Sequence, residues 1–584
     1  MEEIMQLYRE LRGFFDEDDL GLEFCQQIHR IVQETIDRIP DGTRIAIRPA
    51  GKETKNLLKS YDFSGKNIVG IVNRSDIGSD FCGYPCFTAD AFSSEMCDCM
   101  IISAFRYRKE IKEEMEALHI PYIDFHDELE KQGIRLDVSY YDYELYIQLV
   151  VNYYYLRFQR SEARTQRETA LNELLQVAVE CKDFTLISNI YQACGGENGE
   201  FPLLKTVWRK SSQLLDCIQN KLRERKQKDI ILFWTDAVPY DMLRYLPGVM
   251  ELSKQGTFFQ RAYSNTPYTS PTMRAVFCNM LPIDDFPQNQ EKIDSRNSPL
   301  LQFMENEGYK VRFIADPKRA MGKEHLIGAG EGLSCNMKWW KGIIDLLESS
   351  EPCFYLFHFL ESHEPWYTPD LKEPIDPYTA KRIQQEAQAK ASLGYLDQEL
   401  ILYHKLLGDK TQIFFSDHGL HWWEDTRWPE HTLHAYCFAV GKNIPKETVT
   451  RFFPYINVEK FVRWLVDPTH FSLDDACADE VIFQDSDFYN PSPIDRFIQT
   501  NNAKKGLAYR GILNYDYKYV INSLGEEYFY QMQLDGSEKL VPLEDSALRT
   551  KLKGKAGTEF LDIYRYDKFY HTRRLYDYIK SNKA

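Results

Sequence analysis

The feature that most constrains the fold is a series of five short apolar segments in the second half of the chain, separated by stretches with helical patterning. They are Ile230–Trp234, Lys310–Ile314, Cys353–Phe359, Gln412–Phe415 and Tyr436–Val440. Short apolar segments that alternate with helices are typical of βαβ units, and therefore of a parallel sheet covered by helices. Ligands of such sheets bind beyond the carboxyl ends of the strands. The residues that follow each predicted strand are thus the first candidates for a functional site.

Three of the predicted strands do lead into polar side chains of the kinds that bind metals. These side chains are Asp236 after the first strand, His363 with Glu361 and His358 as further candidates around the end of the third, and Asp417 with His418 after the fourth. Carboxylates and imidazoles are ligands for transition metals, and their convergence at strand ends indicates a catalytic site. The sequence therefore predicts that Asp236, Asp417 and His418 hold a metal.

A hydroxyl group completes this predicted set. Thr269 stands in Tyr268-Thr-Ser-Pro-Thr, where a helix is predicted to begin. Backbone N–H groups and the helix dipole favour an anion at such a position. A bound metal lowers the pKa of an oxygen that it contacts and makes that oxygen a nucleophile. We predict that Thr269 is both a metal ligand and the catalytic nucleophile, and that it attacks phosphorus.

The order of these segments resembles the alkaline phosphatase/sulfatase superfamily over roughly residues 229–535. The similar segments are the strand before Asp236, Tyr268-Thr-Ser-Pro-Thr, His358-Phe-Leu-Glu-Ser-His363, Phe415-Ser-Asp-His-Gly419, His431-Thr-Leu-His, and the strand pair around Tyr509 and Tyr517. The resemblance implies an α/β fold, an alkaline-phosphatase-like sandwich around a central, mostly parallel sheet. It also implies a set of substrate-binding residues, namely His363, His431, Glu361 and Arg274.

Several departures separate this chain from the sulfatases of that superfamily. Sulfatases oxidise a Cys or Ser to formylglycine within C/S-x-P-x-R, and a Thr cannot form that aldehyde. Arg274 is five residues after Thr269, out of register with that motif. His418 stands at a position where sulfatases usually carry Asn. Sulfatases usually use calcium, whereas a His ligand favours zinc or manganese. These features resemble the threonine branch, which includes lipid A phosphoethanolamine transferases and lipoteichoic acid synthases.

The first 137 residues also alternate between predicted strands and helices. The strands are predicted at residues 44–48, 66–73, 100–105 and 120–125. This part resembles the Rossmann-like domains found beside sugar-nucleotide and surface-glycan enzymes. A dinucleotide fingerprint needs three glycines and a later acidic residue, but here only Gly51 is present and Asn73 takes the acidic position. A structural or partner-docking module is therefore preferred over a nucleotide-binding one, and no organic cofactor is predicted.

Residues 138–228 are predicted to form a helical connector, and residues 229–584 the catalytic domain. The connector ends in the charged run KLRERKQKD, which is interpreted as a solvated helix end rather than a nucleic-acid patch. A net charge of −17 also argues against nucleic acid as a partner. The acidic N-terminus lacks a signal-peptide pattern, and the longest apolar stretch is too short to span a membrane. These features favour a cytoplasmic enzyme with no transmembrane segment.

Together these observations predict a metal-dependent transferase that works through a covalent Thr269 intermediate. It would move a phosphoethanolamine-like or phosphonate group from an activated phosphoryl or phosphonyl donor to a sugar or glycan acceptor. Two alternatives stay open. One is a phosphodiesterase or phosphonate/sulfate ester hydrolase of the same fold, and the other is an inactive binding module. The sequence does not indicate an oligomeric state.

Overall fold

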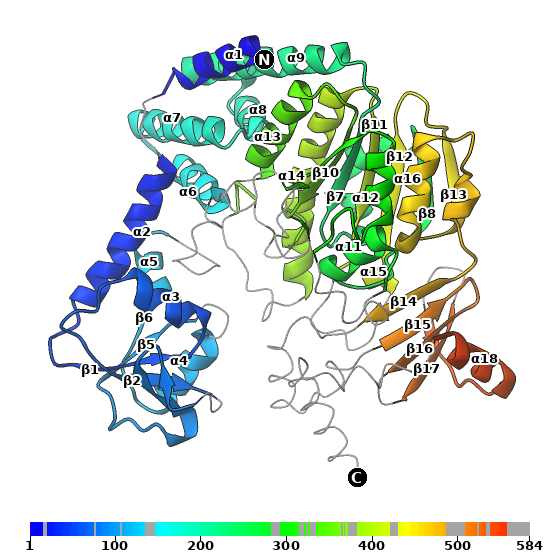
Figure 1. Ribbon diagram of the computed structural model, residues 1–584. Helices are drawn as coiled ribbons and strands as arrows, with labels where there is room; N and C mark the ends of the chain where they lie inside the picture. The colour runs from blue at the N-terminus through cyan, green and yellow to red at the C-terminus, as the bar shows by residue number, and fades with distance from the viewer. Residues whose placement is uncertain are drawn as a thin grey trace.

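The structure is a computed structural model of the 584-residue chain. It describes the whole chain except residues 16–19, 75–77, 105–107, 135–146, 282–291, 315–320, 323–324, 327–334, 364–365, 367, 372–381, 421–429, 486–508, 523–524, 533–537 and 557–584. Figure 1 shows three sheets, of which the N-terminal one and the largest one are linked by a layer of helices. In the part of the chain that is described, no helix is long and apolar enough to cross a membrane.

The largest sheet has seven strands in the order β13-β8-β12-β11-β7-β10-β9. These strands are β7 (Ile230–Thr235), β8 (Thr257–Tyr263), β9 (Lys310–Ile314), β10 (Cys353–Phe359), β11 (Thr411–Ser416), β12 (His434–Val440) and β13 (Glu447–Pro454). Only β12 runs against its neighbours, and all other pairs in this sheet are parallel. The predicted α/β fold with a central, mostly parallel sheet is therefore confirmed.

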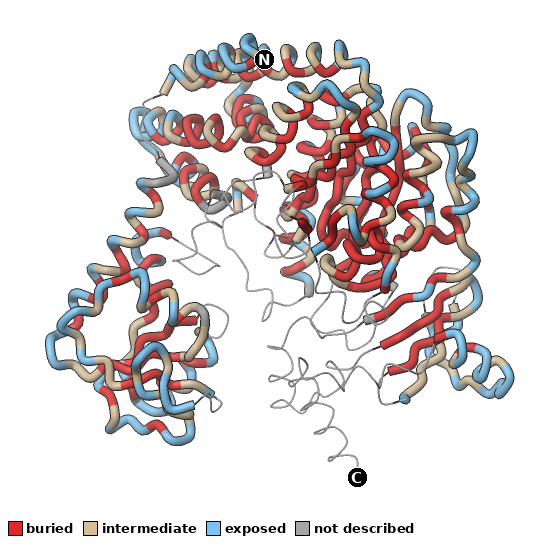
Figure 2. The backbone as a smooth tube through the Cα atoms, in the orientation of Figure 1, coloured by how far each residue is buried: buried red, intermediate tan, exposed pale blue. Residues whose placement is uncertain are grey.

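Strand β7 lies inside the largest sheet, between β11 and β10, and is buried along its whole length. Its side chains alternate between two apolar layers, because successive residues of a strand point to opposite faces. Ile231 and Phe233 pack on the face covered by α9 (Pro202–Glu224), α13 (Cys335–Glu348) and α14 (Arg382–Leu407). Leu232 and Trp234 pack on the face covered by α11 (Thr269–Cys278), α12 (Pro299–Asn306) and α16 (Val458–Val466). Figure 2 shows that most of the backbone of this sheet, which is covered by helices on both faces, belongs to buried residues.

The second sheet, near the N-terminus, has the order β3-β4-β2-β1-β5-β6. Its strands are β1 (Arg44–Arg48), β2 (Asn67–Asn73), β3 (Asp80–Phe81), β4 (Tyr84–Thr88), β5 (Cys99–Ile102) and β6 (Tyr122–Asp124). Apart from the short β3, every pair is parallel. The helices α3 (Lys52–Ser60), α4 (Arg108–Ala117) and α5 (Phe125–Lys131) connect or follow these strands. The four strands predicted from the sequence are present, and β3 and β4 are additional.

A layer of helices links the two sheets. It contains α6 (Ile147–Arg160), α7 (Arg164–Glu180), α8 (Phe184–Ala193) and α9. The first helix, α1 (Glu2–Arg12), lies beside α9 in Figure 1, and Lys210 Nζ is 2.5 Å from Glu10 Oε2. From there α2 (Leu20–Asp37) leads to the N-terminal sheet. The chain thus starts in the helical layer, builds the small sheet, and returns to the same layer at α6. The exact domain boundaries at residues 137 and 228 stay predictions.

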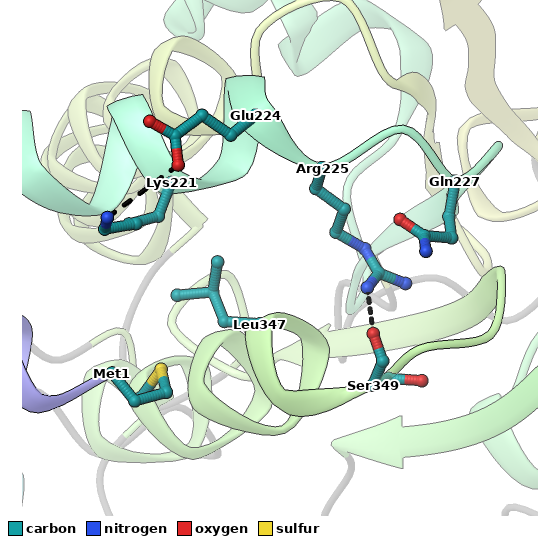
Figure 3. A pocket seen from close by; sticks show the side chains of 7 residues that line it. All are labelled: Met1, Lys221, Glu224, Arg225, Gln227, Leu347 and Ser349. Carbon is teal, nitrogen blue, oxygen red and sulfur yellow. Dashed lines mark hydrogen bonds and ion pairs between the residues drawn. The ribbon is translucent and has the colours of Figure 1, made fainter.

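The charged run at the end of α9 is mostly exposed, as a solvated helix end should be, and Arg225 is the exception. The Arg225 side chain is only 5% exposed and lies beside Asp229, with Nε 2.8 Å from Oδ2 of that carboxylate, and Lys410 Nζ is 2.6 Å from the same oxygen. Arg225 also donates to the backbone oxygen of Ser349, in the small pocket that Figure 3 shows. Asp229 directly precedes β7, so this ion-pair group lies at the amino end of that strand. The prediction therefore fails for Arg225, because the position of its partner carboxylate depends on the placement of β7.

The third sheet is antiparallel and follows the seven-stranded sheet in sequence. Its order is β14-β15-β16-β17-β18, from β14 (Val481–Asp485), β15 (Tyr509–Leu513), β16 (Tyr517–Asn522), β17 (Glu527–Met532) and β18 (Glu538–Leu540). The helix α18 (Ser546–Ala556) packs on it through Leu552. The strand pair expected around Tyr509 and Tyr517 is present as β15 and β16.

Candidate active site

The predicted site residues gather at the carboxyl ends of three neighbouring strands. Thr235 at the end of β7 pairs with Ser416 at the end of β11 on one side and with Phe359 at the end of β10 on the other. Asp236 and Asp417 each follow directly, and both are buried. Because the three strands are parallel and in register, their next residues meet at one edge of the sheet. The site is therefore a product of strand order rather than of sequence proximity.

Hydrogen bonds join the loop after β7 to the loop after β11. Ala237 adopts a left-handed conformation with φ of 58°, and its N–H donates to Asp417 Oδ1 at 2.9 Å. The N–H of His418 donates to the same oxygen at 2.8 Å. Next to this pair, the N–H of Val238 donates to Ser416 Oγ at 2.7 Å. A left-handed conformation is costly for a residue with a Cβ and is concentrated at functional sites, so this local strain supports a functional role for the turn.

The nucleophile candidate reaches the same place from β8. After that strand the chain turns and enters α11, and Thr269 is the first residue of the helix. Its Oγ1 is 3.2 Å from Asp236 Oδ2 and 3.3 Å from His418 Nε2. The turn is held by Asn265, whose side chain donates to the Ile482 carbonyl at 2.6 Å and accepts from the Ile456 N–H at 2.8 Å. The third sheet therefore helps to place the segment that carries Thr269.

The donor atoms of the site fit a metal ion. Oδ1 of Asp236 and Oδ2 of Asp417 are buried, and neither has a hydrogen-bond partner within the described part of the chain. His418 Nε2 is 3.9 Å from the first and 3.5 Å from the second. Asp236, His358 and Asp417 each offer a ligand atom within 4.8 Å of the others. Two adjacent buried carboxylates are unfavourable without a compensating cation, so oxygen and nitrogen atoms arranged in this way match a divalent metal.

The electrostatics of the two carboxylates differ. Burial raises the pKa of Asp236, but the electrostatic effect of the nearby imidazoles of His363, His358 and His418, together with the hydrogen bond from His358, outweighs burial and holds this pKa well below its usual range. Burial and the charge of Asp236 together raise the pKa of Asp417. The histidines thus stabilise one negative charge in this group, whereas a second negative charge needs the further positive charge that a metal supplies.

The structure brings some of the other predicted residues to this group but not all. His363 is half-buried in the turn after β10, and its charge acts on Asp236. Arg274 is buried on α11. His431 belongs to α15 (Glu430–Leu433), but its side chain lies outside the described residues. The substrate-binding roles of His363, Arg274 and His431 stay predictions.

Glu361 lies in a second group of buried acidic side chains. Its charge acts on Asp183 at the start of α8 and on Glu399 of α14. The hydroxyl of Tyr395 donates to Asp183 at 2.6 Å, and Asn336 Nδ2 donates to Glu399 Oε1 at 2.7 Å. Glu361 therefore faces the helical layer, and its predicted substrate-binding role has no support from these contacts. These residues connect the turn that carries His363 to α8, α13 and α14.

This acidic group predicts a pH dependence of stability. Burial raises the pKa of Asp183 from 3.8 to about 6, although the Tyr395 hydrogen bond opposes the shift. The folded protein then binds this proton more tightly than the unfolded chain, so stability is highest below about pH 4 for this group and falls as the pH rises towards 6. The loss amounts to about 3 kcal/mol. Asp183→Asn should remove it, because Asn keeps an acceptor for Tyr395 but carries no charge.

Denaturant unfolding of the wild type and Asp183→Asn from pH 4 to 8 tests this expectation. The stability of the variant relative to the wild type should increase between about pH 4 and pH 6 and then stay constant. A difference that does not change with pH would contradict the assignment of a raised pKa to Asp183.

Sequence reasoning missed two of the residues that build the site and gave a third only as a further candidate. Ser416 and Asn265 act through backbone hydrogen bonds, for which their sequence neighbourhoods carry no signal. His358 was only a further candidate, yet its Nε2 is 3.0 Å from Asp236 Oδ2. The available signal was its position: a histidine inside an otherwise apolar strand must find a polar partner when it is buried.

Comparisons with known proteins give matches at the level of structure only. No protein-family model matches the chain, and no curated protein matches it. Solved structures that are similar include a protein in the alkaline phosphatase superfamily from Vibrio parahaemolyticus (14% identity, 59% of this chain, 94% of that chain, TM-score 0.42). A phosphonate monoester hydrolase of Agrobacterium radiobacter is similar over 56% of this chain and 94% of that chain (14% identity, TM-score 0.42).

A putative sulfatase from Bacteroides fragilis is also similar (12% identity, 60% of this chain, 98% of that chain, TM-score 0.43). By their names, these three neighbours are a member of the alkaline phosphatase superfamily, a phosphonate monoester hydrolase and a putative sulfatase.

Proposed function

We propose that this protein is a zinc- or manganese-dependent enzyme that transfers a phosphoryl or phosphonyl group through a covalent bond to Thr269. The observation that carries the proposal is the position of the Thr269 hydroxyl. It lies at a helix start and within 3.3 Å of both Asp236 and His418, beside two carboxylate oxygens that lack partners among the described residues. A hydroxyl held against metal-ligand atoms is the arrangement that nucleophilic catalysis requires.

Asp236, Asp417 and His418 would hold the ion, with Thr269 as a further ligand. When bound, a divalent metal supplies Lewis-acid stabilisation of negative charge on the oxygens that it contacts. Thr269 Oγ1 is 3.2 Å from Asp236 Oδ2, so this carboxylate oxygen is placed to accept the hydroxyl proton. The start of α11, where Thr269 lies, favours negative charge beside the nucleophile through the helix dipole.

The proposed reaction has two balanced steps. In the first, Thr269 Oγ1 forms a bond to phosphorus, the bond from phosphorus to the leaving oxygen breaks, and the hydroxyl proton passes by way of the site to the leaving group. In the second, an acceptor hydroxyl forms a bond to phosphorus and the bond to Oγ1 breaks. The acceptor proton then returns to Thr269. His363, close enough for its charge to act on Asp236, is proposed to bind phosphoryl oxygens.

The acceptor is proposed to be a sugar or glycan, and the transferred group phosphoethanolamine-like or a phosphonate. What supports this choice is the resemblance of the sequence to the threonine branch and of its first 137 residues to modules of glycan enzymes. Hydrolysis differs only in that water takes the place of the acceptor hydroxyl in the second step. The same residues serve both reactions, so a hydrolase is the second candidate.

The test uses the purified protein loaded with zinc or manganese and two chromogenic probes, bis(p-nitrophenyl) phosphate and p-nitrophenyl phenylphosphonate. We expect metal-dependent release of p-nitrophenol, and an intact mass increased by the phosphoryl or phosphonyl group. Methyl glucoside is then added as a simple sugar acceptor. A transferase should release p-nitrophenol faster and form a phosphorylated or phosphonylated glucoside.

Three results would count against parts of this proposal. A protein that binds neither metal contradicts the enzyme hypothesis as a whole. Turnover without any covalent adduct, even after rapid quenching, contradicts the Thr269 intermediate. If the protein turns over fully in water, and an added acceptor neither speeds the release of p-nitrophenol nor appears in the product, then the protein is a hydrolase.

A further inference from the structure

Two histidines, His358 and His418, have Nε2 within 3.9 Å of an Asp236 oxygen and differ in the hydrogen bonds that their rings make. His358 points from β10 into the apolar layer formed around Trp234, and its side chain is only 2% exposed. His418 follows β11, and its side chain is 5% exposed. Both have Nε2 near Asp236, so proximity alone makes either one a possible ligand.

The ring of His418 is set up to bind a metal. Its Nδ1 is 2.7 Å from the backbone oxygen of Gly419, which can only accept, so Nδ1 carries the proton. The neutral ring then has its lone pair on Nε2. That atom faces Thr269 Oγ1 at 3.3 Å, Asp417 Oδ2 at 3.5 Å and Asp236 Oδ1 at 3.9 Å. A ligating histidine commonly has its other nitrogen fixed by a backbone carbonyl in this way.

The ring of His358 has the opposite arrangement. Its Nδ1 is buried and has no hydrogen-bond partner among the residues described here. A buried N–H without an acceptor is unfavourable, so the favoured neutral ring carries its proton on Nε2 instead. That N–H points at Asp236 Oδ2, 3.0 Å away. With the proton on Nε2 and directed at a carboxylate, His358 has no lone pair to offer to the metal.

We infer that His358 is a positioning residue that orients Asp236, and that the metal site contains one imidazole ligand, from His418. By donating to Oδ2, His358 fixes the rotation of the carboxylate so that Oδ1 faces His418 Nε2. Oδ1 is the oxygen of Asp236 that has no hydrogen-bond partner in the described chain, and it is therefore the ligand atom. This inference rests on the metal site of the proposed function, and it does not depend on the reaction or the substrate.

The inference can be tested without any substrate, by X-ray absorption at the zinc edge of the full-length wild-type protein loaded with one equivalent of zinc. Scattering from imidazole rings should correspond to one ring per zinc. His358→Gln should keep that signal, because a Gln amide can replace the N–H that donates to Asp236. His418→Gln should remove it. Fitting two rings to the wild type, and one to His358→Gln, would overturn the inference.

Zinc affinity measured by competition with a chelator gives a second readout. His358→Ala should bind zinc about 10–100-fold more weakly, as expected when a group that orients a ligand is lost. His358→Gln should recover most of that loss. A His358→Gln protein as weak as His358→Ala would contradict the hydrogen-bond role. A wild type that binds no zinc and no manganese would refute the proposed function and this inference together, whereas two bound imidazoles would refute only the inference.

Discussion

Replacing Thr269 with Ala should reduce the turnover number by roughly 10⁴-fold or more, because the nucleophile is the one group whose loss removes the covalent route altogether. The variant should still bind metal, since Asp236, Asp417 and His418 keep their donor atoms. Its intact mass should not increase on incubation with either chromogenic probe. Steady-state kinetics, metal analysis and mass spectrometry together check these three expectations.

Thr269→Ser is the matched control for this prediction. It keeps a hydroxyl at the first residue of α11 and loses only a methyl group from a half-buried side chain. We expect it to form the adduct and to retain activity within about 100-fold of the wild type, as when a reacting group is kept but held less rigidly. An alanine variant as active as the serine variant would show that Thr269 is not the nucleophile.

Asp417→Asn should abolish metal binding and, in the absence of metal, should make the protein more stable than the wild type. The first effect follows from the loss of an anionic ligand with a buried, unpartnered oxygen. The second follows because the negative charge of Asp236 already disfavours a second buried charge on Asp417. The amide oxygen of Asn still accepts the N–H groups of Ala237 and His418, so the fold of the two loops should be kept.

Thermal unfolding with and without zinc measures both effects at once. Zinc should raise the midpoint of the wild type by linkage and should leave that of Asp417→Asn unchanged. Asp397→Asn is a suitable control, because Asp397 is also buried and accepts two backbone N–H groups, those of Gly248 and Val249, but lies outside the site. A zinc-induced increase in Asp417→Asn equal to that of the wild type would exclude Asp417 as a ligand.

Four of the five strands that sequence patterning predicted in the large sheet, namely β7, β10, β11 and β12, are buried almost throughout, and the missed ones carry mixed patterns. The fully buried β7 and β10 were predicted almost to the residue. By contrast, β8 contains Gln260 and Arg261, and β13 begins with exposed polar residues. Partly exposed strands near a sheet edge need only half of their side chains to be apolar, so a search for apolar runs does not detect them.

Asp236, Asp417 and His418 were accessible from sequence because each follows a strand that could be predicted. The contacts between distant segments were not. Asp183 comes near Glu361 only when α8 packs against the large sheet, and Lys410 pairs with Asp229, at the opposite end of that sheet, only after the strands are ordered. Such contacts depend on the packing of distant segments, which periodicity in a single sequence does not contain.

The bonds from Ala237 and His418 to one oxygen of Asp417 have a consequence for how the ion enters. That carboxylate is held in a single orientation by backbone groups alone, so this part of the proposed metal site keeps its shape without the ion. Little conformational entropy is lost on loading, in contrast to small zinc domains that fold only around their metal. An empty and a loaded molecule should then share the same backbone, and ion exchange becomes a matter of access and supply rather than of refolding.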